Sequence, residues 1–515
     1  MESASRESVG KEPVSKEPVN RDTAPALIIW MTDSAAKLNS AVGSKAAALA
    51  RVADLERDAS DLYQGSLSSQ ERSLQIPIPE GFIIGVAACR EFLNQAAVHE
   101  PLQELFQALE AGRLEPQAFS FQAQLLIATA PPPLGLEEDL AAALDRLQLR
   151  EQGPALLALR SSATCEDLSD ASFAGQFESF LSVSNFEQAL DTYRSVISSL
   201  FSIRVVAYCK ARKQSLAGNL MAVIVQQMVR SDLGASGVLL SSDLDLQANQ
   251  THLLSQKEFR TDITVTSIEA CWGVGDALVG GQIIPERYEV ENQPTTESGP
   301  AAIRVYRQQQ LFKSDGSAQL QETTQAERTS QILTTAQILL LNSWGRRLQQ
   351  SYHQAVDMEW ALDGVTDQMV LVQVRPLPHG PTTADNPTTS NTELLEPHQQ
   401  FPKPLSFGVG IGSGTVEAPV CVLTNPYENS LFRQGDVLVT RSTDPSWLPL
   451  MLQASALITE QGGRNSHAAI LSRELGLLCI VGCADATTVL QGVEHVRLVC
   501  KNGVGEVTDV SVSPS

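Results

Sequence analysis

Basic residues are scarce in this sequence: 37 Lys and Arg stand against 59 Asp and Glu, which gives a formal net charge of −22. Nucleic acids and anionic membrane surfaces attract proteins of the opposite sign, so the charge argues against both as partners. Long apolar runs are also missing, and no segment approaches the length of a membrane span. The polar N-terminal residues contain no apolar core suitable for a signal peptide. We therefore expect residues 1–23 to be a disordered tail and the protein to be cytoplasmic.

Paired cysteine motifs are absent as well. The eight cysteines include no C-x-x-C pair, and the closest two, Cys479 and Cys483, have no nearby partners that would complete a zinc site. We interpret all eight as reduced thiols. What is present is an ordinary globular composition, 43% hydrophobic and 19% charged. A chain of 515 residues is too long for one core, and we expect several domains.

The order of apolar segments predicts alternating strands and helices. A strand is expected at "ALIIWM", followed by an Ala/Leu-rich helix in "VGSKAAALARV" with Lys45 at its start. We expect "MAVIVQQMV" and "SGVLLSSD" to pair as neighbouring strands joined by a turn at "SDLGA". Residues 379–404 are rich in Pro, Thr and Asn without periodicity, which predicts a flexible linker before a compact C-terminal unit.

His467 lies in "TEQGGRNSHAAILSRELG", where small residues surround it. The apolar spacing after it predicts a short helix that starts at Asn465 or Ser466 and ends at Gly476. His467 would then lie in the first helical turn, where free N–H groups and the helix dipole favour an anion and disfavour an imidazolium. A neutral histidine beside an anion site can act as a nucleophile toward phosphoryl groups. The alternative is a histidine that caps a loop or fills a gap in the core.

The segment "AVDMEWALDGVTDQMVLVQVRPL" predicts a hairpin of two strands. Because side chains alternate along a strand, Asp357 and Glu359 share one face of the first strand, and Gln373 and Arg375 share one face of the second. One interpretation is a half-exposed sheet whose polar face meets water. The other is a ligand site in which the carboxylates hold Mg²⁺, Arg375 neutralises phosphate oxygens and Gln373 donates a hydrogen bond.

Two further cations stand at the edges of predicted elements. Arg160 ends the apolar strand "ALLALR", where it could pair with Glu166 or Asp167, and Lys45 could be a solvated lysine at a helix start. Together with Arg375 and the carboxylate pair, they would also suit a nucleotide triphosphate, because phosphoryl transfer depends on positioning and charge neutralisation. No Walker A sequence occurs, so such a site would belong to another class of nucleotide-binding fold.

These segments, in this order, resemble the phosphoenolpyruvate synthase and pyruvate phosphate dikinase family from Leu27 onward. The resemblance is carried by the segments "VGSKAAAL", "ALRSSATCEDLSDASFAGQFES", "MAVIVQQMVRSDLGASGV", "ACWGVGDALVGGQIIPERY", "VDMEWALDG", "VQVRP" and "TEQGGRNSHAAILSRELG". It implies an α/β and α+β multidomain protein with an ATP-grasp domain at 24–378, the linker at 379–404 and a swivelling β/β/α phosphohistidine domain at 405–515.

The resemblance also implies an activity: ATP phosphorylates His467, yielding AMP and phosphate, and the phosphoryl group passes to an acceptor, as in pyruvate, water dikinase. ATP and Mg²⁺ would be required, with Glu359 and Asp357 as metal ligands. The implied nucleotide-binding residues are Lys45, Arg160, Gly175, Ser179, Gln226, Glu359, Gln373 and Arg375.

Some features depart from the family pattern. Asp276 stands where glutamate is usual, Ser179 where threonine is common, and "GLLCIVG" lacks the usual proline. The sequence ends soon after His467, so we expect the C-terminal barrel that binds pyruvate or phosphoenolpyruvate to be missing. The acceptor would then be a small molecule, or a separate polypeptide would supply its site. Two alternatives stay open: a nucleotide-binding regulatory protein derived from a dikinase, and an antibiotic phosphotransferase resembling rifampicin phosphotransferase.

Overall fold

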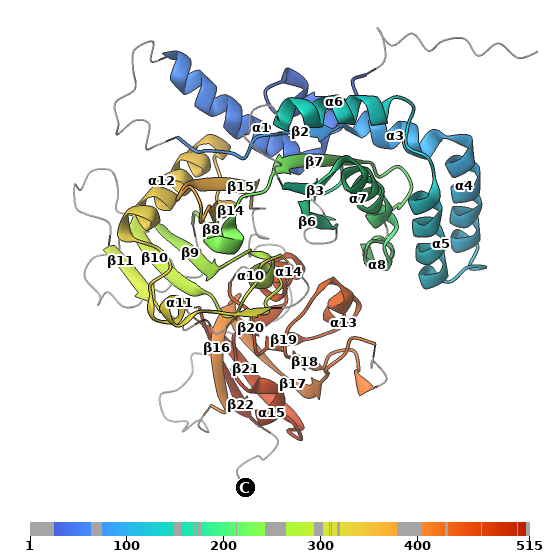
Figure 1. Cartoon of the computed structure of the whole chain (residues 1–515). Coiled ribbons are helices and arrows are strands. Elements are labelled where there is room, and N and C mark those ends of the chain that lie inside the picture. The colour runs from blue at the N-terminus through green and yellow to red at the C-terminus, as the bar shows by residue number, and fades with distance from the viewer. Residues whose placement is uncertain are drawn as a thin grey trace, which may run out of the picture.

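Two open sheets and a closed barrel form the framework of the chain (Figure 1). The computed structural model describes residues 25–62, 75–148, 156–168, 171–172, 177–212, 214–242, 264–292, 302–307, 310, 312–316, 320–377, 404–427, 431–464, 466–501 and 503–510. The predicted tail, almost all of the predicted linker, and Gly175 lie outside these residues. Within them, no helix is long and apolar enough to cross a membrane. The predicted mixture of helices and strands in a multidomain chain is confirmed.

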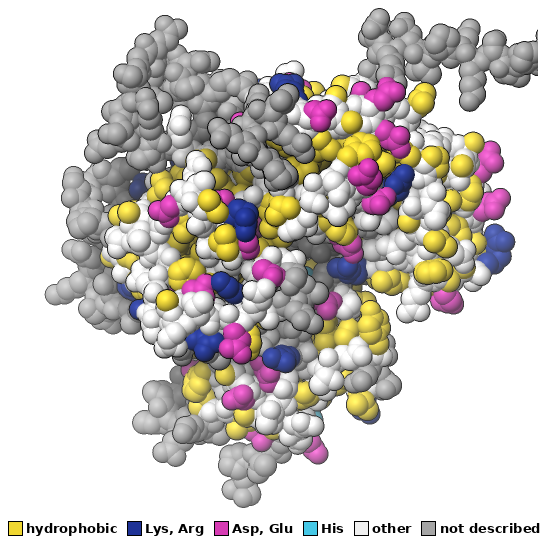
Figure 2. All heavy atoms as spheres, in the orientation of Figure 1, with side chains coloured by type: hydrophobic (Ala, Val, Ile, Leu, Met, Phe, Trp, Pro, Cys, Tyr) yellow, Lys and Arg dark blue, Asp and Glu magenta, His cyan; other side chains and the backbone are white. Residues whose placement is uncertain are grey.

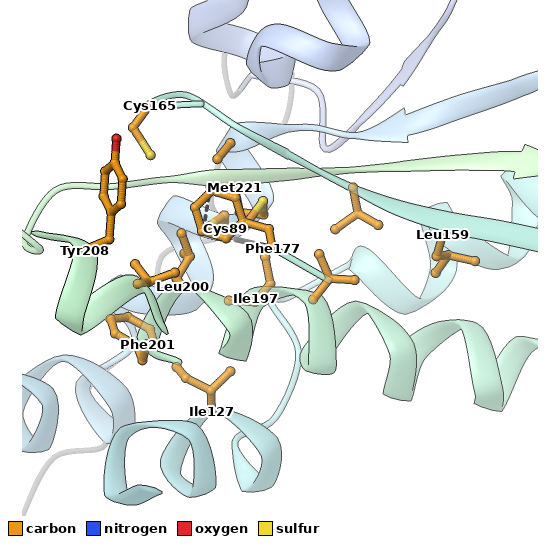
Figure 3. Packing of buried hydrophobic residues seen from close by; sticks show 14 of the residues in the cluster. Cys89, Ile127, Leu159, Cys165, Phe177, Ile197, Leu200, Phe201, Tyr208 and Met221 are labelled. Carbon is orange, nitrogen blue, oxygen red and sulfur yellow. Dashed lines mark hydrogen bonds between the residues drawn. The ribbon is translucent and has the colours of Figure 1, made fainter. Parts of the chain in front are cut away.

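The first sheet has five strands, all antiparallel to their neighbours. Their order is β1 (Ile28–Trp30), β2 (Gly81–Ile84), β7 (Met221–Gln227), β3 (Leu157–Ala163) and β6 (Ser179–Val183). The helices packed with one face of it are α3 (Val86–Asn94), α4 (Ala96–Glu110), α5 (Pro116–Thr129), α6 (Leu136–Gln148), α7 (Phe186–Ser198) and α8 (Ile203–Arg212). Figure 3 shows this core, where Cys89 accepts a hydrogen bond from the Met221 amide among side chains such as Phe177, Ile197 and Phe201.

Helix α1 (Asn39–Leu62) packs with strands β3, β7 and β15. Gly43 interrupts its first turn with a φ of 72°, a conformation that favours glycine. A Cβ on Gly43 would lie 2.0 Å from the carbonyl oxygen of Ser162, so only glycine permits this approach to β3. The Ser162 hydroxyl then donates to the Val42 carbonyl and accepts from the Ala46 amide. These contacts fix the position of Lys45 at the start of the regular helix, as predicted.

The second sheet has six strands, again all antiparallel to their neighbours. Their order is β11 (Ala302–Tyr306), β10 (Glu286–Asn292), β9 (Thr264–Trp272), β8 (Ala235–Leu240), β14 (Val356–Leu362) and β15 (Met369–Pro376). Helix α12 (Thr335–Tyr352) packs with this sheet, and its N-terminus is closed by a capping box between Thr334 and Gln337. Smaller elements in these two parts are β4 (Asp167–Leu168), β5 (Ala171–Ser172), α10 (Asp276–Val279), β12 (Phe312–Lys313), β13 (Gln321–Glu322) and α11 (Gln325–Thr329).

The predicted pairing of "MAVIVQQMV" with "SGVLLSSD" is wrong. The first segment is β7 of the five-stranded sheet, whereas the second is β8, which lies between β9 and β14. The connecting turn bonds to the end of β14: the Arg230 amide donates to Asp363, and the Gly364 amide donates to the Arg230 carbonyl. Gly234 also approaches the Leu362 carbonyl closely. These contacts direct the chain into the second sheet, so an ordinary hairpin does not form.

The C-terminal part forms a closed barrel that contains both parallel and antiparallel strand pairs. Around the barrel the strands are β16 (Ser406–Ile411), β20 (Leu478–Val481), β19 (Ala456–Thr459), β18 (Val437–Thr440), β17 (Gly414–Val422), β21 (His495–Lys501) and β22 (Val504–Asp509). Its helices are α13 (Leu448–Met451), α14 (His467–Leu475) and α15 (Ala486–Val489).

The barrel packs against the rest of the chain through α13. This helix contacts α8, and the buried side chains of Trp447, Leu448 and Met451 belong to the same apolar cluster as Val205 and Cys209. Figure 1 shows the barrel beneath the two sheets, with α14 beside α10. The contact positions the helix of His467 against the N-terminal part of the molecule.

Candidate functional site

The hairpin of β14 and β15 has the register that the sequence predicts. Asp357 lies opposite Arg375, and Glu359 lies opposite Gln373, so the four side chains share one face. Arg375 Nε is 2.9 Å from Asp357 Oδ2, and Asp357 is buried. This face therefore does not simply meet water. Burial raises the pKa of Asp357, against the opposing effect of the Arg375 charge.

Arg160 joins the two sheets. One of its guanidinium nitrogens is 2.7 Å from Glu359 Oε2, and another donates to the Val372 carbonyl at 2.8 Å. Arg160 thus pairs with Glu359, across the sheets. Glu166 pairs instead with Lys45, whose Nζ lies 2.6 Å from Glu166 Oε1. All three predicted cations therefore contact carboxylates, which phosphate oxygens could replace as partners.

Ser179 and Gln226 lie on strands beside Arg160. Ser179 is the direct partner of Arg160 across β3 and β6, and Gln226 is the partner of Ala158, two residues earlier. Gln226 is buried, and its side chain donates to the Pro79 carbonyl at 3.1 Å. The structure thus brings most of the predicted nucleotide residues to the junction between the two sheets. Their binding of nucleotide stays a prediction.

His467 is the first residue of α14, as the sequence predicts. Its Nδ1 lies 3.0 Å from the Thr443 hydroxyl, whereas its buried Nε2 has no hydrogen-bond partner among the described residues. Burial lowers the pKa of His467 to about 4; the Arg204 charge adds to this shift and the Asp444 charge opposes it. The imidazole is therefore neutral at pH 7 and presents one unengaged nitrogen.

The glycine pair before His467 allows the loop to approach the other part of the chain closely. A Cβ on Gly463 would lie 2.5 Å from Glu269 Oε1 and 2.9 Å from Pro285, and Gly462 lies against Gly281. These residues belong to the second sheet and its connections. The absence of side chains therefore permits close packing between the barrel and the second sheet.

The loop before α14 is tied to the second sheet. The Arg473 charge near the end of α14 opposes the effect of burial, which raises the pKa of Asp357. Arg473 donates to the Arg464 carbonyl at 2.6 Å, and the Arg464 amide donates to Glu269 on β9 at 2.8 Å. The barrel is thus docked with the loop before α14 against β9 of the second sheet.

Comparison with known proteins accounts for this arrangement. Residues 39–394 match the model of the pyruvate phosphate dikinase AMP/ATP-binding domain, which is more than half of the chain. This chain belongs to that family. Residues 432–503, which include His467, match the mobile domain of PEP-utilising enzymes. The family assignment suggested by the ordered motifs is confirmed.

Curated relatives of the family cover both parts of the chain. The chain is 32% identical to the phosphoenolpyruvate synthase of Escherichia coli over 453 residues, or 85% of this chain and 54% of that protein. It is 31% identical to the enzyme of Synechocystis over 500 residues, 93% of this chain and 56% of that protein. The match to the Aquifex aeolicus enzyme is 29% over 496 residues, 94% of this chain and 54% of that protein. The chain thus spans about half the length of the curated relatives it matches.

The hairpin of β14 and β15 offers ligands that suit a divalent cation. Oδ1 of Asp357 is buried and has no hydrogen-bond partner among the described residues, and Glu359 lies on the same face. No group of three or more His, Cys, Asp or Glu that could hold a metal occurs in the described ranges. Mg²⁺ usually takes only one or two protein carboxylates and completes its shell with water and phosphate oxygens. The residues present therefore fit Mg²⁺ together with a nucleotide.

Sequence reasoning missed three residues of the dikinase-family site. Thr443 contacts the imidazole, Glu269 accepts from the histidine loop, and Arg204 acts electrostatically on His467. None lies in a sequence pattern that alone indicates a role. Packing within the barrel brings Thr443 to the imidazole, whereas Glu269 and Arg204 come from the first two-thirds of the chain and depend on the packing of the barrel against β9 and α8.

We expect Gly463→Ala to reduce labelling of the chain by ATP, because the added methyl group would meet Glu269 and Pro285 and disturb docking. Labelling by ATP should fall at least about ten-fold, while ATP affinity and melting temperature stay near those of the native chain. Single-turnover labelling and calorimetry provide the two measurements. Native labelling by this variant would show that the docked contact is not needed for transfer.

Proposed function

We propose that the chain is the phosphoryl-donor part of a phosphoenolpyruvate synthase-like dikinase. ATP phosphorylates Nε2 of His467 with release of AMP and phosphate, and the phosphohistidine then passes its phosphoryl group to an acceptor. The observation that carries the proposal is a neutral, buried Nε2 without a described partner, on a helix whose preceding loop bonds to β9 of the second sheet. The domain matches and the phosphoenolpyruvate synthase relatives support the same activity.

The nucleotide is bound at the junction between the sheets. The phosphate oxygens replace carboxylates as partners of Lys45, Arg160 and Arg375, which now pair with Glu166, Glu359 and Asp357. Glu359 and Asp357 would hold Mg²⁺ with their carboxylate oxygens, and the ion would supply neutralisation of phosphate charge. The remaining residues proposed to line the nucleotide are Gly175, Ser179, Gln226 and Gln373.

His467 supplies the nucleophile. Attack requires a lone pair on Nε2, which assigns the proton to Nδ1 and makes the Thr443 hydroxyl the acceptor in their 3.0 Å contact. A bond forms between Nε2 and the β-phosphorus, and the bond to the α-phosphate oxygen breaks, so its electron pair leaves with AMP. Water then cleaves the β–γ linkage and releases phosphate. The Thr443 contact fixes the ring orientation throughout.

Incubation with ATP that carries label in its β-phosphoryl group tests the proposal directly. Transfer of label to His467, with one AMP formed per labelled chain, is the expected result. A chain that binds ATP without taking label would instead be the nucleotide-binding regulatory protein, the alternative that its sequence leaves open. Label on the protein at a residue other than His467 would also overturn the proposal.

Further parts of the proposal concern organisation and partners. We propose a nucleotide domain at 24–378, a linker at 379–404 and a mobile phosphohistidine domain at 405–515, supported by the separation of the two sheets from the closed barrel. The acceptor is a small molecule such as pyruvate, bound by this chain or by a separate polypeptide. A cytoplasmic location agrees with the eight cysteines, all of which lie in the described part of the chain as buried, reduced thiols.

We expect labelling to be insensitive to the titration of His467 between pH 8 and pH 6. The pKa of about 4 keeps its imidazole neutral throughout this range, so the nucleophilic form is lost only as the pH falls toward 4. The same depression makes folding less favourable as the pH falls from 6.5 toward 4, because the unfolded histidine binds a proton first. Single-turnover labelling across pH 5–8 checks the first statement. A labelling rate that falls with a midpoint near pH 6.5 because His467 becomes protonated would contradict the first statement.

A further inference from the structure

We propose that Arg204 contacts the phosphoryl group as it transfers to Nε2 of His467, exchanging its present partner Glu178 for phosphoryl oxygens. The inference rests on the proposed function and names a further catalytic residue for the same site. Arg204 lies near the start of α8, and its guanidinium is 3.1 Å from Glu178 Oε1. Arg204 is not among the residues predicted to bind the nucleotide.

The position of Glu178 connects Arg204 to the nucleotide side. Glu178 directly precedes Ser179, and Ser179 is the cross-strand partner of Arg160. Arg160 in turn contacts Glu359 on the hairpin. Arg204 is therefore held at the start of β6, where Ser179 pairs with Arg160.

The packing of α8 against α13 connects Arg204 to the histidine. Val205, which follows Arg204, belongs to the apolar cluster that also contains Leu448 of α13. Thr443, just before this region, holds Nδ1 of His467. The contact between the barrel and α8 thus brings the helix of Arg204 against the part of the barrel that holds the imidazole.

The electrostatics agree with this position. The charge of Arg204 lowers the pKa of His467, whereas the carboxylate of the exposed Asp444 raises it. A phosphoryl group that moves from the nucleotide to His467 carries its negative charge away from Lys45, Arg160 and Arg375. Arg204 stands on the receiving side, where a guanidinium can bond phosphoryl oxygens in the transition state. Its present ion pair is partly exposed, so exchanging Glu178 for phosphoryl oxygens costs little.

The exchange changes no covalent bond other than those already stated for transfer. Nε2 bonds to phosphorus, the electron pair of the broken bond leaves with AMP, and the guanidinium keeps its protons. Arg204 contributes charge and direction only. Loss of one such group in phosphoryl or acyl transfer typically costs about 100-fold or more in rate.

Arg204→Gln and Arg204→Lys test the inference by labelling with β-labelled ATP in single turnovers. We expect Arg204→Gln to slow labelling about 100-fold and Arg204→Lys about ten-fold, with ATP affinity within about three-fold of the native chain. In histidine-labelled protein, NMR titration should show a higher pKa of His467 in Arg204→Gln, because a nearby positive charge is gone. The His467 signal is identified by its absence from His467→Ala.

Glu178→Gln is the matched control, because it breaks the same ion pair and keeps the arginine. Labelling of this variant should not fall. The comparison therefore distinguishes an effect of the Arg204 charge on transfer from an effect of losing the ion pair on the structure. Native labelling by Arg204→Gln, or an equal loss in Glu178→Gln, overturns the inference while the proposed function stands. If Arg204→Gln does not fold, the comparison of Arg204→Lys with Glu178→Gln decides in the same way. No label on the native chain would overturn the proposed function and the inference together.

Discussion

The chain with His467 replaced by alanine is expected to take no label from β-labelled ATP, while ATP affinity stays within about three-fold of the native value. Removal of the nucleophile eliminates the atom to which phosphorus bonds, so the loss is complete and not partial. The proposed nucleotide residues lie at the junction of the two sheets, whereas His467 belongs to the barrel. Labelling and calorimetry measure the two properties on the same preparation.

His495→Ala is the matched control for this prediction. His495 begins β21 on the exposed surface of the same barrel, so its loss should leave labelling intact. A large fall in ATP affinity in His467→Ala would show that the nucleotide and the histidine form one binding site. Labelling of His467→Ala at the rate of the native chain would exclude His467 as the phosphoryl carrier.

Glu359→Gln is expected to slow Mg²⁺-dependent labelling by at least about 100-fold and more than Asp357→Asn does. The Glu359 side chain is 28% exposed and contacts Arg160, so its oxygens can reach a nucleotide-bound cation. The Asp357 side chain is only 11% exposed and pairs with Arg375, so we expect its main role to be holding that arginine. Labelling rates over a series of Mg²⁺ concentrations measure the difference.

The two substitutions also differ in their effect on stability. Asp357→Asn removes the charge that faces a largely buried guanidinium, so this variant should melt at a lower temperature than Glu359→Gln. A greater demand for Mg²⁺ in Asp357→Asn than in Glu359→Gln would reverse the assignment. The unpartnered Oδ1 of Asp357 would then be the principal metal ligand.

The negative net charge of the chain makes the cations of these ion pairs important for binding a nucleotide. On the face shown in Figure 2, Asp and Glu side chains are interspersed with Lys and Arg, in a chain with a net charge of −22. A polyanionic nucleotide therefore needs cations that the fold concentrates locally. Arg160 and Arg375 provide them, because strands from different sheets bring them to the same hairpin.

Local patterns were sufficient where the relevant interaction is itself local. Alternation along 356–376 predicted that Asp357 and Glu359 share a face, and the spacing after His467 predicted the start and end of α14. Both follow from fixed periods, two residues for a strand and 3.6 for a helix. The ordered motifs likewise gave the family before any contact was known.

Local patterns failed where a distant segment provided the partner. Adjacent strands usually pair, yet β7 and β8 lie in different sheets because the turn between them bonds to Asp363 and Gly364. The sequence near Arg160 suggested Glu166 as a possible ion-pair partner. In the tertiary structure Arg160 pairs with Glu359, and Glu166 pairs with Lys45. Which charges pair depends on distances that sequence spacing does not contain.

The sequence by itself determined the family, the helix that carries His467 and the side chains on the hairpin, since these depend on composition, order and backbone period. Only the tertiary structure decided the environment of His467: its contact with Thr443, the lowered pKa and the influence of Arg204. It also decided that Gly463 serves the approach of the barrel to Glu269. Burial and electrostatic coupling depend on which surfaces meet, and here surfaces more than a hundred residues apart in the chain meet around one imidazole.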